Sequence, residues 1–178
     1  MAGRGDMVAL PLVSLGVVAL VVLVCLSAFF SSSETAIFSL PVEQLTERAG
    51  SGDGRAAQLA ELREDPHRLL VTLLVGNNVV NVAISSITTA ILVESFSTGV
   101  AVLLATVLAS ATVLVFGEIV PKSYGLGNAL AWALRVARPL RMVELVLFPL
   151  VVVFDVATRR LSAALGGEAA IEEYVEET

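Results

Sequence analysis

Residues 69–93 read LLVTLLVGNNVVNVAISSITTAILV, an apolar run with a cluster of amides near its middle. A run of this length is long enough to cross a bilayer as a helix. Polar groups at membrane depth are costly and usually mark a substrate or ion path. A helix places Asn77 and Asn81, four residues apart, on one face and turns Asn78 about 100° away. The stretch therefore predicts a spanning helix with a functional polar face, although interhelical hydrogen bonds that only hold a bundle together would use the same amides.

A second polar cluster ends another apolar run, at residues 100–120, and reads FGEIVPK over residues 116–122. Glu118 is the only ionisable group within that run. Pro121 has no N–H to donate to the carbonyl of Gly117 four residues earlier, so that carbonyl needs another partner, and a cation would serve. The alternative is an ordinary terminal ion pair between Glu118 and Lys122, with Lys122 as an interfacial anchor.

The first apolar run covers residues 7–33 and adds hydroxyl groups. Ser27 and Ser31 are four residues apart, so both hydroxyls share a helix face. The bland alternative is that each serine bonds its own carbonyl four residues back. Ser31 and Glu34 have the spacing of a capping box, which predicts that the helix breaks or restarts there and makes Glu34 a cap first and a ligand second.

Composition restricts the class of protein. The chain has 178 residues, 56% of them hydrophobic, and a mean hydropathy of +0.86, which favours the bilayer as solvent. The net charge of -6 argues against nucleic acid or an anionic lipid surface as the main partner.

Cys25 is the single cysteine, cannot form an intrachain disulfide, and fits a small apolar role. The single His67, and the lack of a phosphate-binding glycine loop or a Ser-His pair at membrane depth, predict that the chain is not an enzyme.

The polar segments predict the topology. Residues 41–68 carry four arginines and a turn at 51–54, which predicts an amphipathic hairpin at the membrane surface, whereas the 94–99 link has no Lys or Arg. The positive-inside rule therefore places the N-terminus and the link outside, and the hairpin and the C-terminal part in the cytoplasm. Residues 126–165 are studded with Arg and broken by two prolines, which favours interfacial juxtamembrane helices over a fourth crossing. Residues 166–178 predict the start of an acidic helix that leads to a soluble domain.

Together these groups form one candidate site for a hard cation. It offers two hydroxyls, two amides, one carboxylate and one freed carbonyl, supplied by Ser27, Ser31, Asn77, Asn81, Glu118 and Gly117. Six oxygens suit octahedral Mg²⁺. One formal charge among them predicts weak binding, as a transport site requires, because the ion must also leave.

At this point the chain resembles the CNNM/CorC membrane domain. The serine-rich residues 27–36 are similar to the first-span signature of that family, 76–81 to its second-span motif and 117–122 to its third-span motif, in the same order. Residues 65–70 are similar to its entry into the second span. The likeness covers about residues 20–165, and one departure is Ser32, where the family more often has glycine.

The resemblance implies an all-α membrane protein, a homodimeric Mg²⁺ transporter with three spans and a cytoplasmic belt of juxtamembrane helices. It implies an inward-facing acidic cavity and one dehydrated ion per protomer, with ligands matching Ser27, Ser31, Asn77, Asn81 and Glu118. A glycine carbonyl near Pro121, from Gly117 or Gly125, completes the set. A cytoplasmic CBS pair and exchange of Mg²⁺ for sodium are further implications.

Three hypotheses follow. In the first, the chain exports Mg²⁺ across the cell membrane by alternating exposure of this site. In the second, it is a magnesium-sensing membrane scaffold that regulates another transporter. In the third, it is a structural anchor whose polar groups only bind each other, and it shows no ion dependence.

Overall fold

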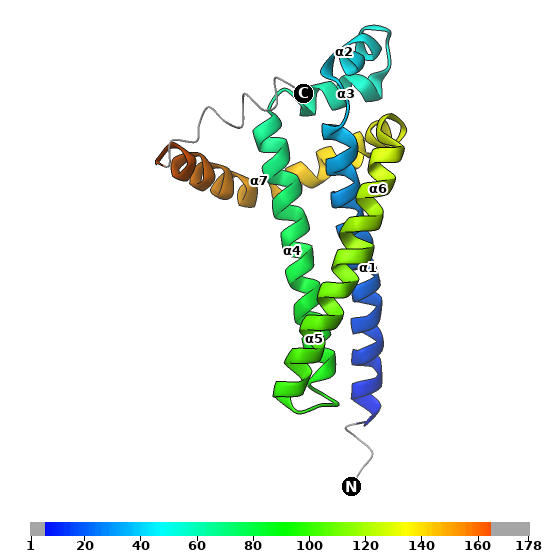
Figure 1. Cartoon of the computed structure of the whole chain (residues 1–178), viewed down its shortest axis with the longest axis vertical. Helices are drawn as coiled ribbons and strands as arrows, with labels where there is room; N and C mark the ends of the chain where they lie inside the picture. The colour runs from blue at the N-terminus through cyan, green and yellow to red at the C-terminus, as the bar shows by residue number, and fades with distance from the viewer. Residues whose placement is uncertain (1–5, 165–178) are drawn as a thin grey trace. The chain divides into compact units, whose positions relative to one another are not determined.

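The computed structural model describes the backbone of residues 6–164 and, within that range, the side chains of residues 13–154, 156–158, 160 and 161. The elements described are all helical (Figure 1): α1 (Asp6–Phe38), α2 (Val42–Gly50), α3 (Gly54–Leu62), α4 (Pro66–Leu92), α5 (Thr98–Thr112), the π-helix η1 (Val113–Ile119), α6 (Val120–Gly127) and α7 (Ala129–Ala164). Three segments are long and apolar enough to cross a membrane: Val13–Phe38, Pro66–Leu92 and Thr98–Gly127. The prediction of an all-α membrane protein is confirmed, and the predicted acidic segment 166–178 lies outside the described residues.

Helix α1 continues without interruption through its serine-rich stretch. The prediction of a break or restart between Ser31 and Glu34 is therefore wrong. Ser31, Ser32 and Ser33 are all buried, at 0%, 3% and 0% exposure. A break here would leave backbone N–H and C=O groups to be satisfied without water, whereas an unbroken helix pairs them internally.

The chain divides into two compact units, and each is described by itself. Within the described residues, the first unit contains α1 up to Ser31 and the segment Asn77–Pro121. Its core includes a stripe of small residues on α5, Ala101, Ala105 and Ala109, each at most 2% exposed. Small side chains at four-residue spacing let helix backbones approach closely.

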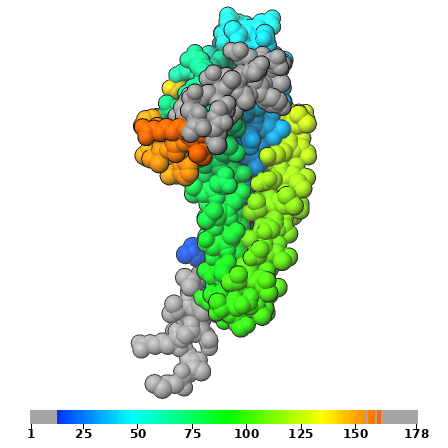
Figure 2. Space-filling view, turned by 60° about the vertical axis from the view of Figure 1, so that its left-hand side comes forward, coloured from blue at the N-terminus to red at the C-terminus, as the bar shows by residue number. Residues whose placement is uncertain are grey.

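The outer faces of the first unit are apolar. Val18, Val82, Leu103 and Val107 are each 60% exposed or more. Figure 2 shows the green surface that α4 and α5 present to the outside. Such exposure would be a liability in water, but it is what a bilayer as solvent favours.

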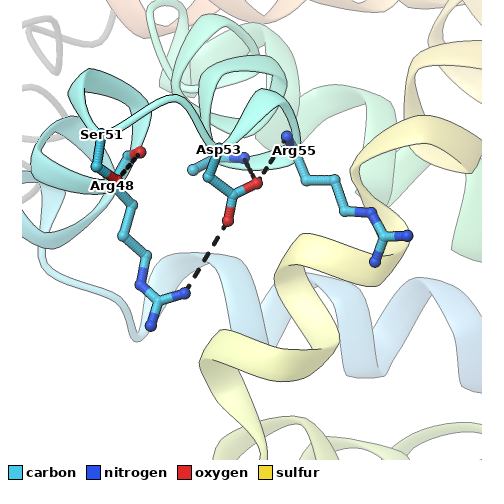
Figure 3. Close-up of polar contacts among 5 residues, drawn as sticks. Arg48, Ser51, Asp53 and Arg55 are labelled. Carbon is cyan, nitrogen blue, oxygen red and sulfur yellow. Dashed lines mark hydrogen bonds and ion pairs between the residues drawn. The ribbon is translucent and has the colours of Figure 1, made fainter.

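The second unit contains Ser32–Gly76 and the described residues from Lys122 onward. Its α2–α3 hairpin confirms the turn predicted at residues 51–54 (Figure 3). Gly52 has φ of 93°, a conformation that glycine adopts without steric cost. Asp53 caps α3, because its Oδ1 accepts the N–H groups of Arg55 at 3.0 Å and Ala56 at 3.4 Å. The hairpin therefore forms from local sequence signals.

The end of α1 is held by an arginine from the other side of the hairpin. Arg63 Nη1 donates a hydrogen bond to the carbonyl of Leu40, and its guanidinium lies 5.9 Å from the centre of the Phe38 ring. Burial lowers the pKa of Arg63, and the nearby carboxylate of Glu43 partly opposes that shift. The contact satisfies a carbonyl just beyond the last turn of α1.

Helix α7 forms one element over residues 129–164 with Pro139 and Pro149 inside it, so the two prolines do not divide it as predicted. It is not among the three candidate spans found in the described residues, and its assignment as a juxtamembrane helix stays a prediction. One face of α7 is buried, at Ala133, Val136, Ala137 and Leu140, and α3 packs on α7. Farther along, Val151 and Leu147 pack against Val71 and Val75 of α4.

Candidate metal centre

Three side-chain oxygens from two helices meet in the first unit. Ser27 Oγ on α1 lies 3.1 Å from Asn77 Oδ1 and 2.8 Å from Asn81 Oδ1, both on α4. We call these three oxygens the oxygen cluster. Ser27 is 0% exposed, and both asparagines are half-buried. A hydroxyl carries one proton, so at any instant it can donate fully to only one of the two amide oxygens.

The helical period explains why these residues meet. Asn77 and Asn81 lie one turn apart and face the same way, whereas Asn78 is exposed. Ser27 hydrogen-bonds across to α4, in contrast to Thr72 and Thr88, which donate to their own carbonyls four residues back. The alternative in which Ser27 donates to its own carbonyl four residues back is therefore not what the structure gives.

Gly117 of η1 closes the third side of the oxygen cluster. A Cβ added at Gly117 would lie 2.5 Å from Ser27 Oγ and 3.3 Å from Ser27 Cβ. Real Cβ atoms do not approach an oxygen that closely, so glycine is what lets the third span come up against Ser27. The structure thus brings together Ser27, Asn77, Asn81 and Gly117.

The third span changes its hydrogen-bond register at this point. Residues 113–119 form a π-helix, and the N–H of Val120 donates to the carbonyl of Val115, five residues back. Residue 121 would bond the carbonyl of Gly117 in an α-helix and that of Phe116 in a π-helix. Because residue 121 is proline, neither carbonyl receives a hydrogen bond from it. The sequence indicated a freed carbonyl through Pro121, but nothing in it indicated the π-helix, a form often found at functional sites.

The other two predicted ligands lie beside the oxygen cluster without joining it. Ser31 is one turn beyond Ser27 on α1 and is 0% exposed. Glu118 follows Gly117 and is half-buried. Among the described residues, the side chain of Glu118 makes no hydrogen bond or ion pair. From Val13 onward, the only other charged residue of the described first unit is Glu94, so Glu118 has no cationic partner there.

In the second unit, Lys122 pairs with Glu34. The two charged atoms, Lys122 Nζ and Glu34 Oε2, lie 3.9 Å apart and join α6 to α1. The alternative in which Lys122 neutralises Glu118 is therefore not the pairing that the structure gives. Glu34, predicted as a helix cap, instead forms an interhelical ion pair.

Ser32 and Gly125 form a second close approach between helices. A Cβ at Gly125 would overlap the carbonyl oxygen of Ser32, so Gly125 brings α6 against the backbone of α1. The hydroxyl of Ser32 accepts a hydrogen bond of 3.0 Å from Trp132 Nε1 on α7. Tyr124 packs edge-on against Trp132, with ring centres 5.4 Å apart. Sequence reasoning missed this contact, although the single tryptophan and the serine that replaces a family glycine were both visible.

The helices that carry these residues are similar in sequence to known proteins. The family model of the cyclin M transmembrane N-terminal domain (CNNM) matches residues 18–178. A chloroplastic DUF21 domain-containing protein of Arabidopsis thaliana is 34% identical over 161 residues, which are 89% of this chain and 24% of the relative. The inner membrane protein YfjD of Escherichia coli is 33% identical over 146 residues, 79% of this chain and 33% of the relative.

A shorter match extends to a named transporter. The metal transporter cnnm-1 of Caenorhabditis elegans is 35% identical over 105 residues, 57% of this chain and 12% of the relative. The chain thus spans a third or less of the length of these three curated relatives. Since the family model covers nearly the whole sequence, including all the helices that carry the oxygen cluster, the chain belongs to the cyclin M transmembrane N-terminal domain family.

Proposed function

We propose that this chain is the membrane domain of a divalent-metal transporter, and that it moves Mg²⁺ through the oxygen cluster. The observation that carries the proposal is the arrangement of Ser27, Asn77 and Asn81, in which one hydroxyl proton is shared between two amide oxygens at 2.8 and 3.1 Å. An oxygen-rich, proton-poor group of atoms at membrane depth is better satisfied by a cation than by itself.

The spacing of the oxygens supports Mg²⁺ as the ion. Mg²⁺ holds its oxygen ligands at about 2.0–2.1 Å in an octahedron, which puts neighbouring ligands about 2.9 Å apart. The distances from Ser27 Oγ to the two amide oxygens bracket that value. The hydroxyl of Ser27 can therefore occupy a corner of an octahedron next to each of the two amide oxygens after little movement.

The remaining ligands come from the residues that surround the oxygen cluster. Glu118 supplies the single negative charge, the carbonyl of Gly117 lacks a donor at position 121, and Ser31 adds a second hydroxyl after a rotation of its side chain. Since Gly125 packs against the backbone of Ser32, we assign the glycine carbonyl to Gly117. One charge among six oxygens keeps binding weak enough for release, and we propose export, in exchange for sodium, as the direction of transport.

The names of two relatives support the proposed transport function, and the distribution of arginines supports the proposed topology. The metal transporter cnnm-1 carries the function in its name, and YfjD is named an inner membrane protein. We propose a multi-pass protein of the cell membrane with its N-terminus outside and its C-terminal part cytoplasmic, because the arginines concentrate in residues 41–68 and in α7. A cytoplasmic CBS pair as a partner of this domain remains a prediction.

We also propose a homodimer formed through α4. Ser85 and Ser86 are both exposed on this spanning helix. Polar side chains that face lipid are costly, whereas across a helix–helix interface they pack closely and bond. A cysteine at position 86, in a Cys25→Ala background, is expected to cross-link two copies in membranes. A Leu103→Cys variant on the lipid-facing side of α5 should not.

Ion-dependent stability tests the site. A ligand that binds only the folded state raises the melting temperature as its concentration rises. We expect Mg²⁺ to stabilise the purified protein more than Ca²⁺, and Asn81→Ala and Glu118→Ala to abolish the effect. Asn78→Ala is the matched control, since this exposed amide lies outside the oxygen cluster. If wild type shows no rise at tens of millimolar Mg²⁺, the oxygen cluster is a structural anchor and the proposal is wrong.

Ion flux separates the transporter from the magnesium sensor. Purified protein in sealed vesicles loaded with a Mg²⁺ indicator should move Mg²⁺ without any partner, and Asn81→Ala should not. Stabilisation by Mg²⁺ without flux would overturn transport by this chain and favour the sensing scaffold.

A further inference from the structure

An apolar groove opens on the first unit, away from the oxygen cluster. It has a volume of about 330 Å³ and lies between α1 and the end of α4. Its walls are the apolar and small residues Val13, Leu15, Gly16, Ala19, Ile87, Ala90 and Ile91, and Glu94 is the one charged residue that lines it.

Close contact of two helices forms the floor of the groove. A Cβ at Gly16 would lie 3.0 Å from Cδ1 of Ile91, so the helices meet at Gly16. Leu15, beside this contact, is 66% exposed and stands at the side of the groove. From Ile87 to Glu94 the helix and its turn rise about 10 Å, which is the length of several methylene groups.

Glu94 marks the polar end of the groove. It lies two residues beyond Leu92, the last residue of α4, and is exposed. A residue at the end of a spanning helix lies where hydrocarbon gives way to head groups. Among residues 13–154, no ion pair is formed by Glu94. The groove therefore combines an apolar slot with a carboxylate at the level of the lipid head groups.

We propose that this groove binds one acyl chain of a phospholipid whose head group carries a primary ammonium, with the ammonium on Glu94. A head group with a net negative charge would be repelled by the Glu94 carboxylate, and a primary ammonium, unlike choline, has N–H groups that can donate charge-assisted hydrogen bonds to it. The length and apolar lining select a single chain. The site is independent of the ion site, since it shares no residue with the oxygen cluster.

Native mass spectrometry of the purified protein tests this proposal. The protein is incubated in detergent with equal amounts of phosphatidylethanolamine, phosphatidylcholine and phosphatidylglycerol. We expect wild type to retain phosphatidylethanolamine over phosphatidylglycerol by about threefold, which corresponds to one exposed ionic contact. Glu94→Gln should abolish that preference but retain lipid, and Glu47→Gln, which removes the same charge from exposed α2, should leave it unchanged.

Filling the groove tests its location. Ala90→Leu places a larger side chain in the slot and should lower the amount of retained lipid, whereas Ala111→Leu, on an exposed part of α5, should not. Equal retention of the three lipids by wild type would overturn the proposal, as would a preference that survives Glu94→Gln. If Ala90→Leu changes the oligomeric state and leaves lipid retention intact, the groove accommodates a second copy instead of a lipid.

Discussion

The oxygen cluster of the first unit and the ion pairs of the second unit treat polar groups in opposite ways. In the second unit, three acids pair with a base on another helix: Glu144 with Arg68 at 3.0 Å, Glu61 with Arg141 at 2.9 Å, and Glu34 with Lys122 at 3.9 Å. In the first unit, two amide oxygens share the one hydroxyl proton of Ser27, and Glu118 has no cation among the described residues. The second unit balances these charges within the protein, whereas the charge of Glu118 is not balanced within the described first unit, and the proposed ion site depends on this difference.

The largest expected effect comes from Gly117→Ala. The added Cβ would overlap Ser27 Oγ and crowd Ser27 Cβ at 3.3 Å, so the hydroxyl must rotate away from the amide oxygens or the helices must separate, and both packing and ion binding should suffer. We expect a loss of about 1–3 kcal/mol of stability and no stabilisation by Mg²⁺, measured by thermal unfolding. Gly127→Ala is the matched control, because nothing lies within 4 Å of its added Cβ. If Gly117→Ala keeps its stabilisation by Mg²⁺, the ion does not bind at the oxygen cluster.

Ser27→Ala should have the next largest effect. It removes the hydroxyl that both amide oxygens share, so the two acceptors lose their donor in a buried setting. Without Mg²⁺ we expect a cost of about 1–3 kcal/mol, and the titration with Mg²⁺ should flatten. A variant that loses stability but keeps its full response to Mg²⁺ would show that Ser27 only holds α1 to α4.

Much of this arrangement could be predicted from sequence, and the reasons are local. Four-residue spacing put Asn77 and Asn81 on one face, and the run lengths gave the three spans. Asp53 and Gly52 determined the hairpin. The continuity of α1 and the π-helix in the third span could not be predicted, because both depend on packing against other helices. The capping pattern at Ser31 is a local signal that the surrounding helices override.

Trp132→Phe tests a polar contact of the second unit that is satisfied within the protein. It keeps an aromatic ring against Tyr124 but removes the donor to Ser32 Oγ. We expect a loss of about 0.5–1.5 kcal/mol, with the increment due to Mg²⁺ preserved, because this polar contact is satisfied within the protein. Adding Ser32→Ala should cost less in Trp132→Phe than in wild type, as a double-mutant cycle would measure. Additive costs would mean that the two side chains are not coupled.

Arg141→Gln should have the smallest effect. Its partner Glu61 and Arg141 itself are about half exposed, at 53% and 49%. Exposed ion pairs contribute about 0–1 kcal/mol and are screened by salt. We expect a small fall in melting temperature at low ionic strength that disappears near 1 M salt, where the screening length is about 3 Å. A large fall in melting temperature that does not depend on salt would show that this ion pair stabilises the protein as a buried contact does.

The hydrogen bond between Trp132 and Ser32 also has an optical consequence. The chain contains one tryptophan, so its tryptophan emission comes from a single, known position on α7. Indole emission responds to the hydrogen bond of its N–H group, and here that bond is made to a buried hydroxyl of α1. Any rearrangement that separates α7 from α1 will therefore shift the wavelength of the tryptophan emission maximum. This shift can be measured in the unmodified protein without a label.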